Sequence, residues 1–456
     1  MSGLPAGWAL ASVGDLVERV EAGLNVKCIE RPPESGERGL VKISAVTSGR
    51  FEQDKSKTLP KGIEVDVRNR IAPGDLLFSR ANTIELVGAC ALVDRVDRTL
   101  YLSDKVLRLV APLKTKRWLN LALKTPDARR AIAEASSGNQ LSMRNIAQDR
   151  LRALPVPVAP LAEQQRIADK LEAVLGRVDA CRDLLDHVGP LLKRFRQSVL
   201  QAATTGSLTD SWRQLHGERP WLESTLGELG LVSGGLTKNS RREALATRYR
   251  YLRVANVYAN RLQLADVSDI GATEAEFRRT RLEDGDLLIV EGNGSIEQVG
   301  RVAMWRGALP DCSHQNHLIR WRAGPDALPA YLLYWLMSPI GRTALMARAS
   351  SSSGLHTLSI GKVGTIAIST PSVAEQASIV AEVQRLFELA DRLEARLRTA
   401  QRLAARLTPA LLAKAFRGEL VPQDPADEPA QALLDRVRAA RASKPPGRLR
   451  RQPAGA

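Results

Sequence analysis

The chain repeats itself at a distance of about 212 residues. The first run starts at Pro160 with Pro-Leu-Ala-Glu-Gln, and the second starts at Pro371 with Pro-Ser-Val-Ala-Glu-Gln. Ile167 in the first run has its counterpart in Ile379, 212 positions later. After each start, apolar or small residues recur at steps of four and three, which is the a/d spacing of a coiled coil. One fold unit has therefore been duplicated within a single chain.

Each run predicts a long helix with an apolar seam. Two copies related by an internal twofold axis make a self-complementary contact, so the helices are predicted to pair antiparallel with one domain at each end. The rival interpretation is two amphipathic helices, each packed on its own domain. Gly189-Pro190 is expected to interrupt the first helix. The predicted seam positions are Ile167, Leu171, Val174, Val178, Cys181, Leu185 and Val188, followed in the second copy by Ile379, Val383, Leu386, Ala390, Leu393, Leu397 and Ala400.

The segments that precede the helices repeat less closely. Gly74-Asp75-Leu76-Leu77 answers to Gly285-Asp286-Leu287-Leu288, and Arg108 answers to Arg320, but the residues between these anchors differ. Short apolar runs with turn residues give way to helical spacing in each segment, which predicts an α+β fold. We expect two similar mixed α/β target-recognition domains joined by two long antiparallel coiled-coil helices, with internal pseudo-twofold symmetry. The predicted boundaries are a domain at 1–159, a helical spacer at 160–206, a second domain at 207–370, a second spacer at 371–421 and a disordered basic tail at 422–456.

The formal net charge of +16 favours a polyanionic partner. Most of the positive charge is on arginine, whose planar guanidinium pairs with phosphate or with the edge of guanine. A GC-rich genome explains part of an arginine bias, but it does not explain an excess of sixteen charges. Nucleic acid is the partner that this charge favours, with a basic solubility surface or a basic tail as the alternative.

Several classes of protein lack their signatures here. The sequence has no apolar run near twenty residues and does not begin like a signal peptide, so we expect a soluble, cytoplasmic protein that does not enter a membrane. The four cysteines are scattered, and disulfides are not expected. A P-loop, a carboxylate-X-Lys nuclease motif and an Asn/Asp-Pro-Pro-aromatic methyltransferase motif are all missing. We therefore predict no catalytic residues in this chain.

One cluster has the chemistry of metal ligands. Cys312, His314 and His317 offer three candidate ligands within six residues. No fourth ligand suggests itself, and an alternating strand would place His317 on the face opposite the other two. We predict a strand edge, or polar side chains that face nucleic acid, and no metal site.

The run 160–167, the stretch 191–203, their imperfect repeats at 371–376 and 411–420, and the opening Pro5-Ala6-Gly7-Trp8 with Gly14-Asp15-Leu16 resemble the specificity subunits of type I restriction-modification systems. The resemblance covers about residues 4–422. It implies a subunit that reads a bipartite, asymmetric site in double-stranded DNA with two recognition domains, and helices that set the gap and bind two methyltransferase subunits. Restriction subunits would dock on that core. The chain itself would hold no cofactor, because S-adenosylmethionine and ATP would belong to the partner subunits.

The resemblance does not identify the residues that read bases. We predict polar groups near the turns that follow the second-strand motif and precede the last helix of each domain, because Arg and Lys suit guanine while Asn and Gln suit adenine. These candidates are Ser79, Arg80, Asn82, Asn139, Gln140 and Arg144 in the first domain, and Asn293, Ser295, Gln298, His314, Gln315, His317 and His356 in the second. Candidates for phosphate contacts are Lys238, Arg241, Arg242, Arg278 and Arg279.

Two other functions stay open at this point. A coiled-coil scaffold with incidental basic charge would share the helices and the composition. A nuclease with a divergent site would share the affinity for DNA. For each candidate residue, an ordinary solvated loop position is the alternative.

Overall fold

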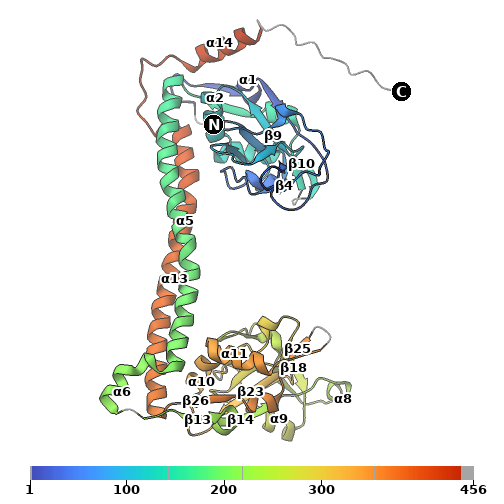
Figure 1. Ribbon diagram of the computed structural model, residues 1–456, viewed down its shortest axis with the longest axis vertical. Coiled ribbons are helices and arrows are strands. Elements are labelled where there is room, and N and C mark those ends of the chain that lie inside the picture. The colour runs from blue at the N-terminus through green and yellow to red at the C-terminus, as the bar shows by residue number, and fades with distance from the viewer. Residues whose placement is uncertain (1–2, 141–142, 218, 353–354, 443–456) are drawn as a thin grey trace. The chain divides into compact units, whose positions relative to one another are not determined.

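The computed structural model of the chain describes residues 3–140, 143–217, 219–352 and 355–442 (Figure 1). It divides into unit 1, which comprises Met1–Leu184 and Ala400–Ala456, and unit 2, which comprises Leu185–Thr399. Each unit holds one mixed α/β domain and one part of each long helix, α5 (Leu161–Thr205) and α13 (Val373–Phe416). In the part of the chain that the structure describes, no helix has both the length and the apolar character that crossing a membrane requires.

The domain of unit 1 contains a four-stranded antiparallel sheet, two three-stranded sheets and a terminal pair of strands. The four-stranded sheet has the order β2 (Arg19–Glu21), β9 (Val106–Val110), β5 (Leu76–Ser79), β7 (Cys90–Leu92). The three-stranded sheets have the orders β4 (Ser56–Thr58), β3 (Arg38–Val41), β8 (Thr99–Tyr101) and β10 (Ser137–Gln140), β11 (Met143–Asn145), β6 (Ala81–Asn82). The first and last strands pair antiparallel and close the domain: β1 (Ala9–Ser12) and β12 (Pro155–Val158). The helices are α1 (Val13–Leu16), α2 (Leu113–Ala122), α3 (Pro126–Ala135) and α4 (Gln148–Arg152).

The domain of unit 2 repeats each of these sheets. Its four-stranded sheet has the order β14 (Gly230–Gly234), β23 (Leu318–Ala323), β19 (Leu287–Val290), β21 (Val302–Met304). The three-stranded sheets are β18 (Ser268–Gly271), β15 (Arg248–Leu252), β22 (Cys312–His314) and β20 (Gly292–Asn293), β25 (Leu355–Thr357), β24 (Ser350–Ser352). The closing pair is β13 (Leu222–Thr225) and β26 (Ala367–Thr370). The predicted repeat of an α+β domain is therefore confirmed, and it extends through the whole sheet framework.

Unit 2 also has elements of its own and a set of short helices. A hairpin is added by β16 (Val257–Tyr258) and β17 (Arg261–Leu262). The helices are α6 (Asp210–His216), α7 (Leu226–Leu229), α8 (Ser240–Glu243), α9 (Glu274–Thr280), α10 (Pro329–Met337), α11 (Pro339–Arg348) and α12 (Ile360–Gly364). The helices α7, α10, α11 and α12 repeat α1, α2, α3 and α4 at nearly the same offset.

The ends of the long helices are part of the domain cores. In unit 1, Phe416 at the end of α13 packs against Trp118, with ring centroids 4.6 Å apart, and Trp118 packs against Trp8 at 5.7 Å. In unit 2, Phe387 of α13 contacts Tyr334 of α10 edge to face at 5.8 Å. Burial of such a side chain contributes about 1.5–3 kcal/mol. The helices thus pack on the domains at their ends and on each other between them.

The helix pair is antiparallel, as predicted. In unit 1 the guanidinium of Arg182 on α5 donates to the carbonyl of Ala404 on α13 at 2.7 Å. In unit 2, Arg196 forms an ion pair with Asp391 at 2.7 Å. Along the helix pair, one set of buried and half-buried positions recurs with a strict period of seven. They are Leu171, Val178, Leu185, Leu192 and Val199 on α5, and Val383, Ala390, Leu397, Ala404 and Leu411 on α13.

Most of the predicted seam positions are covered, but two are wrong. Cys181 and Leu393, which occupy equivalent places in the two copies, are exposed. Arg182, the neighbour of Cys181, crosses the seam and donates to the carbonyl of Ala404 on α13. The buried predicted positions are Ile167, Leu171, Val178, Ile379, Val383, Ala390 and Leu397, and the half-buried ones are Val174, Leu185, Val188, Leu386 and Ala400.

The expected interruption at Gly189-Pro190 is also wrong. The helix α5 continues through Pro190, and α13 continues through Pro409. A proline inside a helix removes one backbone hydrogen bond and costs about 3 kcal/mol. The half-buried Leu185 and the buried Leu192 lie on either side of Pro190, so the apolar seam continues across the proline.

The segment after α13 is not a disordered tail over its first part. It forms α14 (Ala430–Ala442), whose Ala430 and Leu434 are buried in the core of unit 1. The amide of Ala430 donates to the carbonyl of Gly7 at 2.9 Å, and Asp427 pairs with Arg166 at 2.5 Å. The sequence did not predict this helix because it contains few apolar residues among many Arg and Ala residues. Residues 443–456, the rest of the predicted tail, lie outside the described residues.

Leu434→Ala should destabilise unit 1. Truncation of a fully buried leucine typically costs about 2–5 kcal/mol, and the side chain of Leu434 lies in the same core as Trp8 and Trp118. Urea unfolding followed by tryptophan fluorescence measures the loss. The matched control is Leu215→Ala on α6, because that leucine is 83% exposed and should leave the unfolding curve unchanged. Equal midpoints for both variants would show that α14 is not part of the core.

Candidate nucleic-acid interface

A buried carboxylate lies in the first turn of each long helix. Glu163 accepts a hydrogen bond from the indole of Trp8 at 3.0 Å, and its counterpart Glu375 accepts one from the indole of Trp221 at 3.3 Å. Both carboxylates are almost completely buried. A buried charge needs such partners, because water no longer solvates it. The Glu-Gln motif therefore binds each helix to its own domain and is not an exposed surface.

The glutamines of the motif complete this anchor. The amide of Gln164 donates to the carbonyl of Ala159 at 2.8 Å. The amide of Gln376 donates to the carbonyl of Pro371 at 2.9 Å and accepts from the backbone of Leu328 at 2.8 Å. These bonds fix the point at which each helix leaves the last strand of its domain.

The two anchors differ in charge compensation. Glu375 also accepts from the hydroxyl of Thr209 at 2.8 Å and pairs with Arg213 at 3.1 Å. Burial raises the pKa of Glu163, and the hydrogen bond from Trp8 opposes that shift. The second anchor is therefore the better neutralised of the two.

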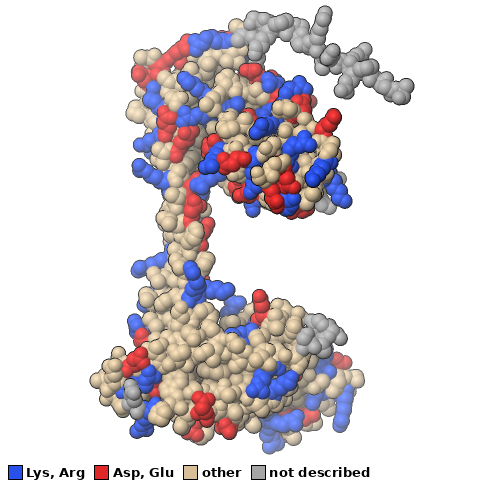
Figure 2. Space-filling model, in the orientation of Figure 1, with Lys and Arg blue, Asp and Glu red and all other residues tan. Residues whose placement is uncertain are grey.

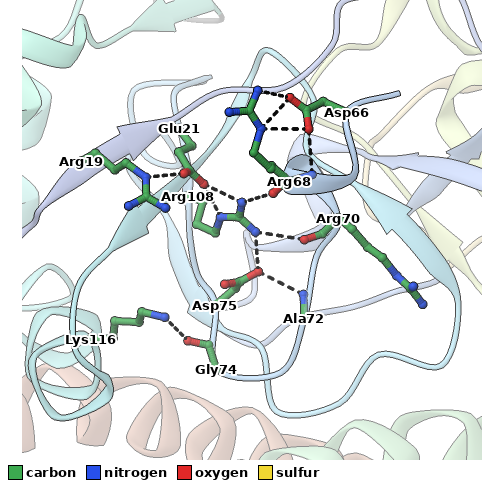
Figure 3. A network of polar contacts seen from close by, with 10 residues as sticks. All are labelled: Arg19, Glu21, Asp66, Arg68, Arg70, Ala72, Gly74, Asp75, Arg108 and Lys116. Atoms are coloured by element: carbon green, nitrogen blue, oxygen red, sulfur yellow. Dashed lines mark hydrogen bonds and ion pairs between the residues drawn. The ribbon is translucent and has the colours of Figure 1, made fainter. Parts of the chain in front are cut away.

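Arg108 holds the loop at 66–75 against the four-stranded sheet of unit 1 (Figure 3). Its guanidinium donates to Glu21 at 2.7 Å and to Asp75 at 3.0 Å, and also to the backbone carbonyls of Arg68 and Arg70. This side chain is nearly buried. The positive charge of Arg108 is therefore neutralised by carboxylates inside the domain.

In unit 2 two arginines share that role. Arg320, the counterpart of Arg108, donates to the carbonyl of Arg281 at 2.8 Å, and Arg322 pairs with Asp286 at 2.7 Å. Some of the arginines that raise the net charge are thus structural.

Three short segments lie side by side at one corner of the unit 1 domain: residues 80–82, 103–105 and 144–146. The amide of Arg80 donates to the carbonyl of Lys105 at 2.9 Å, and the amide of Ile146 donates to the carbonyl of Arg80 at 3.0 Å. Asn82 of β6 lies opposite Arg144 of β11. We call this arrangement the three-segment ladder of unit 1.

Unit 2 has a three-segment ladder with the same backbone contacts, formed by residues 291–293, 315–317 and 356–358. The amide of Glu291 donates to the carbonyl of His317 at 3.0 Å, and the amide of Leu358 donates to the carbonyl of Glu291 at 2.7 Å. Asn293 of β20 lies opposite His356 of β25. The backbone frame is therefore constant while most of the side chains on it differ.

The charged side chains on the unit 1 ladder are three cations, Arg80, Lys105 and Arg144, and one carboxylate, Asp104. The guanidinium of Arg80 donates to the amide oxygen of Asn145 at 3.2 Å, and Arg144 donates to backbone carbonyls that include that of Gly138 at 3.0 Å. Lys105 is exposed, and within the described ranges it has no ion-pair partner. Asn82 and Lys105 line a hollow of about 560 Å³. Polar donors around a hollow are suited to contact with base edges.

The side chains on the unit 2 ladder have a different charge. The carboxylate of Glu291 accepts from Nδ1 of His317 at 3.1 Å, and this histidine is 58% exposed. The amide oxygen of Asn293 accepts from the backbone of Ser295 at 3.0 Å. Gln315 is half-buried beside them.

The structure brings many of the predicted base-reading residues together and corrects two. The ladders contain Arg80, Asn82, Arg144, Asn293, Gln315, His317 and His356. Ser295 and Gln298 lie in the turn after β20. Ser79 and His314 are fully buried and cannot touch DNA. The side chains of Asn139 and Gln140 lie outside the described part of the chain.

The physical reason for both corrections is that β5 and β22 are covered on both faces. Ser79 and His314 are the last residues of these strands, and every residue of both strands is buried. Burial lowers the pKa of His314 to about 3, so its imidazole is neutral near pH 7. Cys312 is buried on the same strand, whereas His317 belongs to the ladder.

The predicted phosphate-contacting residues fall into an exposed group and one residue that is mostly buried. Lys238, Arg241, Arg278 and Arg279 are exposed on unit 2. Arg242 is mostly buried and forms an ion pair with Glu276 at 2.9 Å, which ties α8 to α9. Its role is structural.

Sequence reasoning missed seven polar ladder positions: Ser103, Asp104, Lys105, Asn145, Glu291, Asn316 and Thr357. These positions can be identified from the sequence by applying the offset of the repeat to residues of the other domain. Glu291 follows Arg80 by the same 211 positions that separate the two Gly-Asp-Leu-Leu motifs, and His317 follows Lys105 by 212.

Comparison with known proteins is informative over nearly the whole chain. No family model matches it. The specificity subunit of the type I restriction enzyme EcoKI from Escherichia coli K12 is 30% identical over a gapped alignment of 466 positions, and the match covers 96% of this chain and 97% of that protein. A chain from a study of complex assembly and conformational transition in the type I R-M system has a TM-score of 0.64 and 19% identity, and the match covers 92% of this chain and 100% of that one. The HsdS subunit from Thermoanaerobacter tengcongensis has a TM-score of 0.51 and 20% identity, with coverages of 91% and 98%.

The two anchors should respond in opposite directions to removal of charge. Glu163→Gln keeps an acceptor for Trp8 and removes a buried charge. Because the pKa of Glu163 is raised in the folded state, ionisation costs stability as pH rises above the ordinary glutamate value of about 4.3. The melting temperature of Glu163→Gln should therefore equal or exceed that of the parent at pH 7, with the difference shrinking toward pH 4.

Glu375→Gln is the matched variant, and it should lower stability by about 2 kcal/mol, because it breaks the pair with Arg213. Thermal melts of both variants between pH 4 and pH 8 provide the measurement. Equal losses for both variants at every pH would contradict the assignment of Glu163 as the less compensated carboxylate.

Proposed function

Because the chain belongs to the specificity subunits of type I restriction enzymes, we propose that it reads a bipartite, asymmetric DNA site, one half with each domain. Its place in this family makes it a DNA-recognition subunit and not a catalytic one. The observation that supports the split site is the pair of three-segment ladders: one backbone frame carries different polar side chains in the two units. Different donors and acceptors select different bases, so the halves of the site should differ.

We further propose that the helix pair binds two methyltransferase subunits. Leu184, Leu191, Leu389 and Leu403 are exposed, and each directly precedes a seam residue. They therefore share one phase relative to the seam. A twofold axis perpendicular to the plane of an antiparallel helix pair keeps residues that hold the same heptad position on the same face of the pair. Each unit therefore presents two of these leucines on one face: Leu184 with Leu403, and Leu191 with Leu389.

Exposed apolar residues in line mark a surface that a partner covers. Figure 2 shows uncharged surface along part of the helix pair. One such surface in each unit supports two copies of the partner. S-adenosylmethionine and ATP belong to partner subunits in this proposal, and restriction subunits would join the same core.

The helices should act as a ruler between the half-sites. Insertion of one heptad into both helices, between Leu175 and Val178 and between Phe387 and Ala390, keeps the period of the seam and lengthens the pair by about 10 Å. At ~3.4 Å per base pair, the gap should grow by roughly three base pairs while both half-sites stay unchanged. Sequencing of methylated sites in a host that carries the insertion measures the gap. An active protein with the old gap and a changed half-site would contradict this role.

Leu191→Arg and Leu403→Arg, at equivalent positions of the repeat, should weaken methyltransferase binding. These side chains are 52% and 58% exposed, so the fold should tolerate the change. Loss of a central apolar contact costs about 2 kcal/mol, or roughly thirtyfold in affinity. Calorimetric titration with the methyltransferase subunit measures it, and Leu215→Arg on α6 is the control. Parent-like affinity in both variants would move the docking surface elsewhere.

A further inference from the structure

We infer that the two ladders read opposite hydrogen-bonding groups on the bases, an inference that rests on the proposed function. The unit 1 ladder donates to acceptor edges, of which guanine O6 and N7 are the best match for Arg80 and Lys105. The unit 2 ladder accepts from an exocyclic amine, as on cytosine or adenine, through Glu291 and His317.

Four positions of the two ladders correspond to one another in pairs. Arg80 and Glu291 occupy the same place in the two frames, because each donates its amide to the residue across the ladder and accepts from the residue on its other side. Lys105 and His317 are the residues across. One unit therefore holds two cations where the other holds a carboxylate and an imidazole. The sign of the charge reverses between Arg80 and Glu291, whereas Lys105 is replaced by an imidazole and Asp104 by the uncharged Asn316.

The cations of unit 1 are not explained by the fold. Arg80 contacts a neutral amide oxygen, and no carboxylate pairs with Arg80 or Lys105 in the described ranges. Arg108, by contrast, is neutralised by two carboxylates. Asp104 lines the same hollow as Lys105, but within the described ranges it forms no ion pair with Lys105 or Arg80. The donors of these two cations can therefore serve acceptors of a partner, and guanine offers two on one edge.

Glu291 and His317 of unit 2 offer hydrogen-bond acceptors to a partner. The carboxylate of Glu291 can only accept when ionised, so Nδ1 of His317 carries the proton in the bond between them. In the neutral imidazole, Nε2 then keeps a lone pair as a second acceptor beside the carboxylate. A carboxylate near the DNA phosphates is repelled by their negative charge unless it accepts a hydrogen bond from a base. Cytosine N4 and adenine N6 are the amines that the major groove presents.

The asparagine shared by both ladders fits this division. Asn82 and Asn293 are placed alike, opposite Arg144 and His356. An amide both donates and accepts, so it can serve either half-site. The difference between the half-sites then comes from the positions around it.

Reciprocal exchange tests the inference in the complete complex with its methyltransferase. Arg80→Glu with Lys105→His gives unit 1 the pair of unit 2, and Glu291→Arg with His317→Lys does the reverse. The readout is the base preference at each position of the methylated motif in the host genome. We expect the first exchange to replace guanine by a base with an exocyclic amine at one or two positions of one half-site. The second exchange should act on the other half-site only, with the gap unchanged.

The controls change charge elsewhere on each domain. Lys61→Glu in unit 1 and Asp284→Lys in unit 2 are exposed positions outside the ladders, and both half-sites should stay as in the parent. If the exchanges also leave both half-sites unchanged while methylation continues, the inference is overturned.

An exchanged complex that no longer methylates is titrated with the parental site and with random duplex. Loss of at least about tenfold for the parental site alone supports a reading role, since one wrong base contact costs ~1–3 kcal/mol. Equal loss on both duplexes contradicts it. A parent protein whose methylated motif has no two separate halves would instead refute the proposed function, whatever the ladder variants do.

Discussion

The burial of one carboxylate at the start of each long helix is the constraint on which the rest of the structure depends. Glu163 and Glu375 are out of contact with water, and the indoles of Trp8 and Trp221 supply hydrogen bonds in its place. Each tryptophan precedes the first strand of its domain, and that strand pairs with the last strand. The two ends of a domain are thereby locked to the helix that follows, which gives each helix a defined origin.

The positive charge of the chain divides into two populations. Arg108, Arg242 and Arg322 pair with carboxylates inside the domains and hold loops or helices in place. Arg80 and Lys105 lie at a corner of unit 1 without such partners in the described ranges. A net charge of +16 therefore overstates the number of side chains free for phosphates or bases. Only the second population bears on recognition.

Sequence reasoning succeeded where the signal was periodic and failed where it was local. The seven-residue period placed most of the seam, but a strict step of four and three misplaced Cys181 and Leu393. Pro190 suggested a break, yet burial on both sides of it outweighs one lost hydrogen bond. Ala430 and Leu434 are too few to mark a helix by composition, and their burial depends on the distant core of unit 1.

The sequence by itself determined the duplication, the two long antiparallel helices and the pairing of constant helices with divergent domains, because repeats and heptads are properties of residue order. Only the tertiary structure decided which polar residues share a corner. Residues 80–82, 103–105 and 144–146 are far apart in the chain, and backbone hydrogen bonds between strands bring them together. It also decided that Ser79 and His314 are buried while Lys105 and His317 are exposed, because the packing of the whole domain covers β5 and β22 on both faces and leaves the turns at 105 and 317 open.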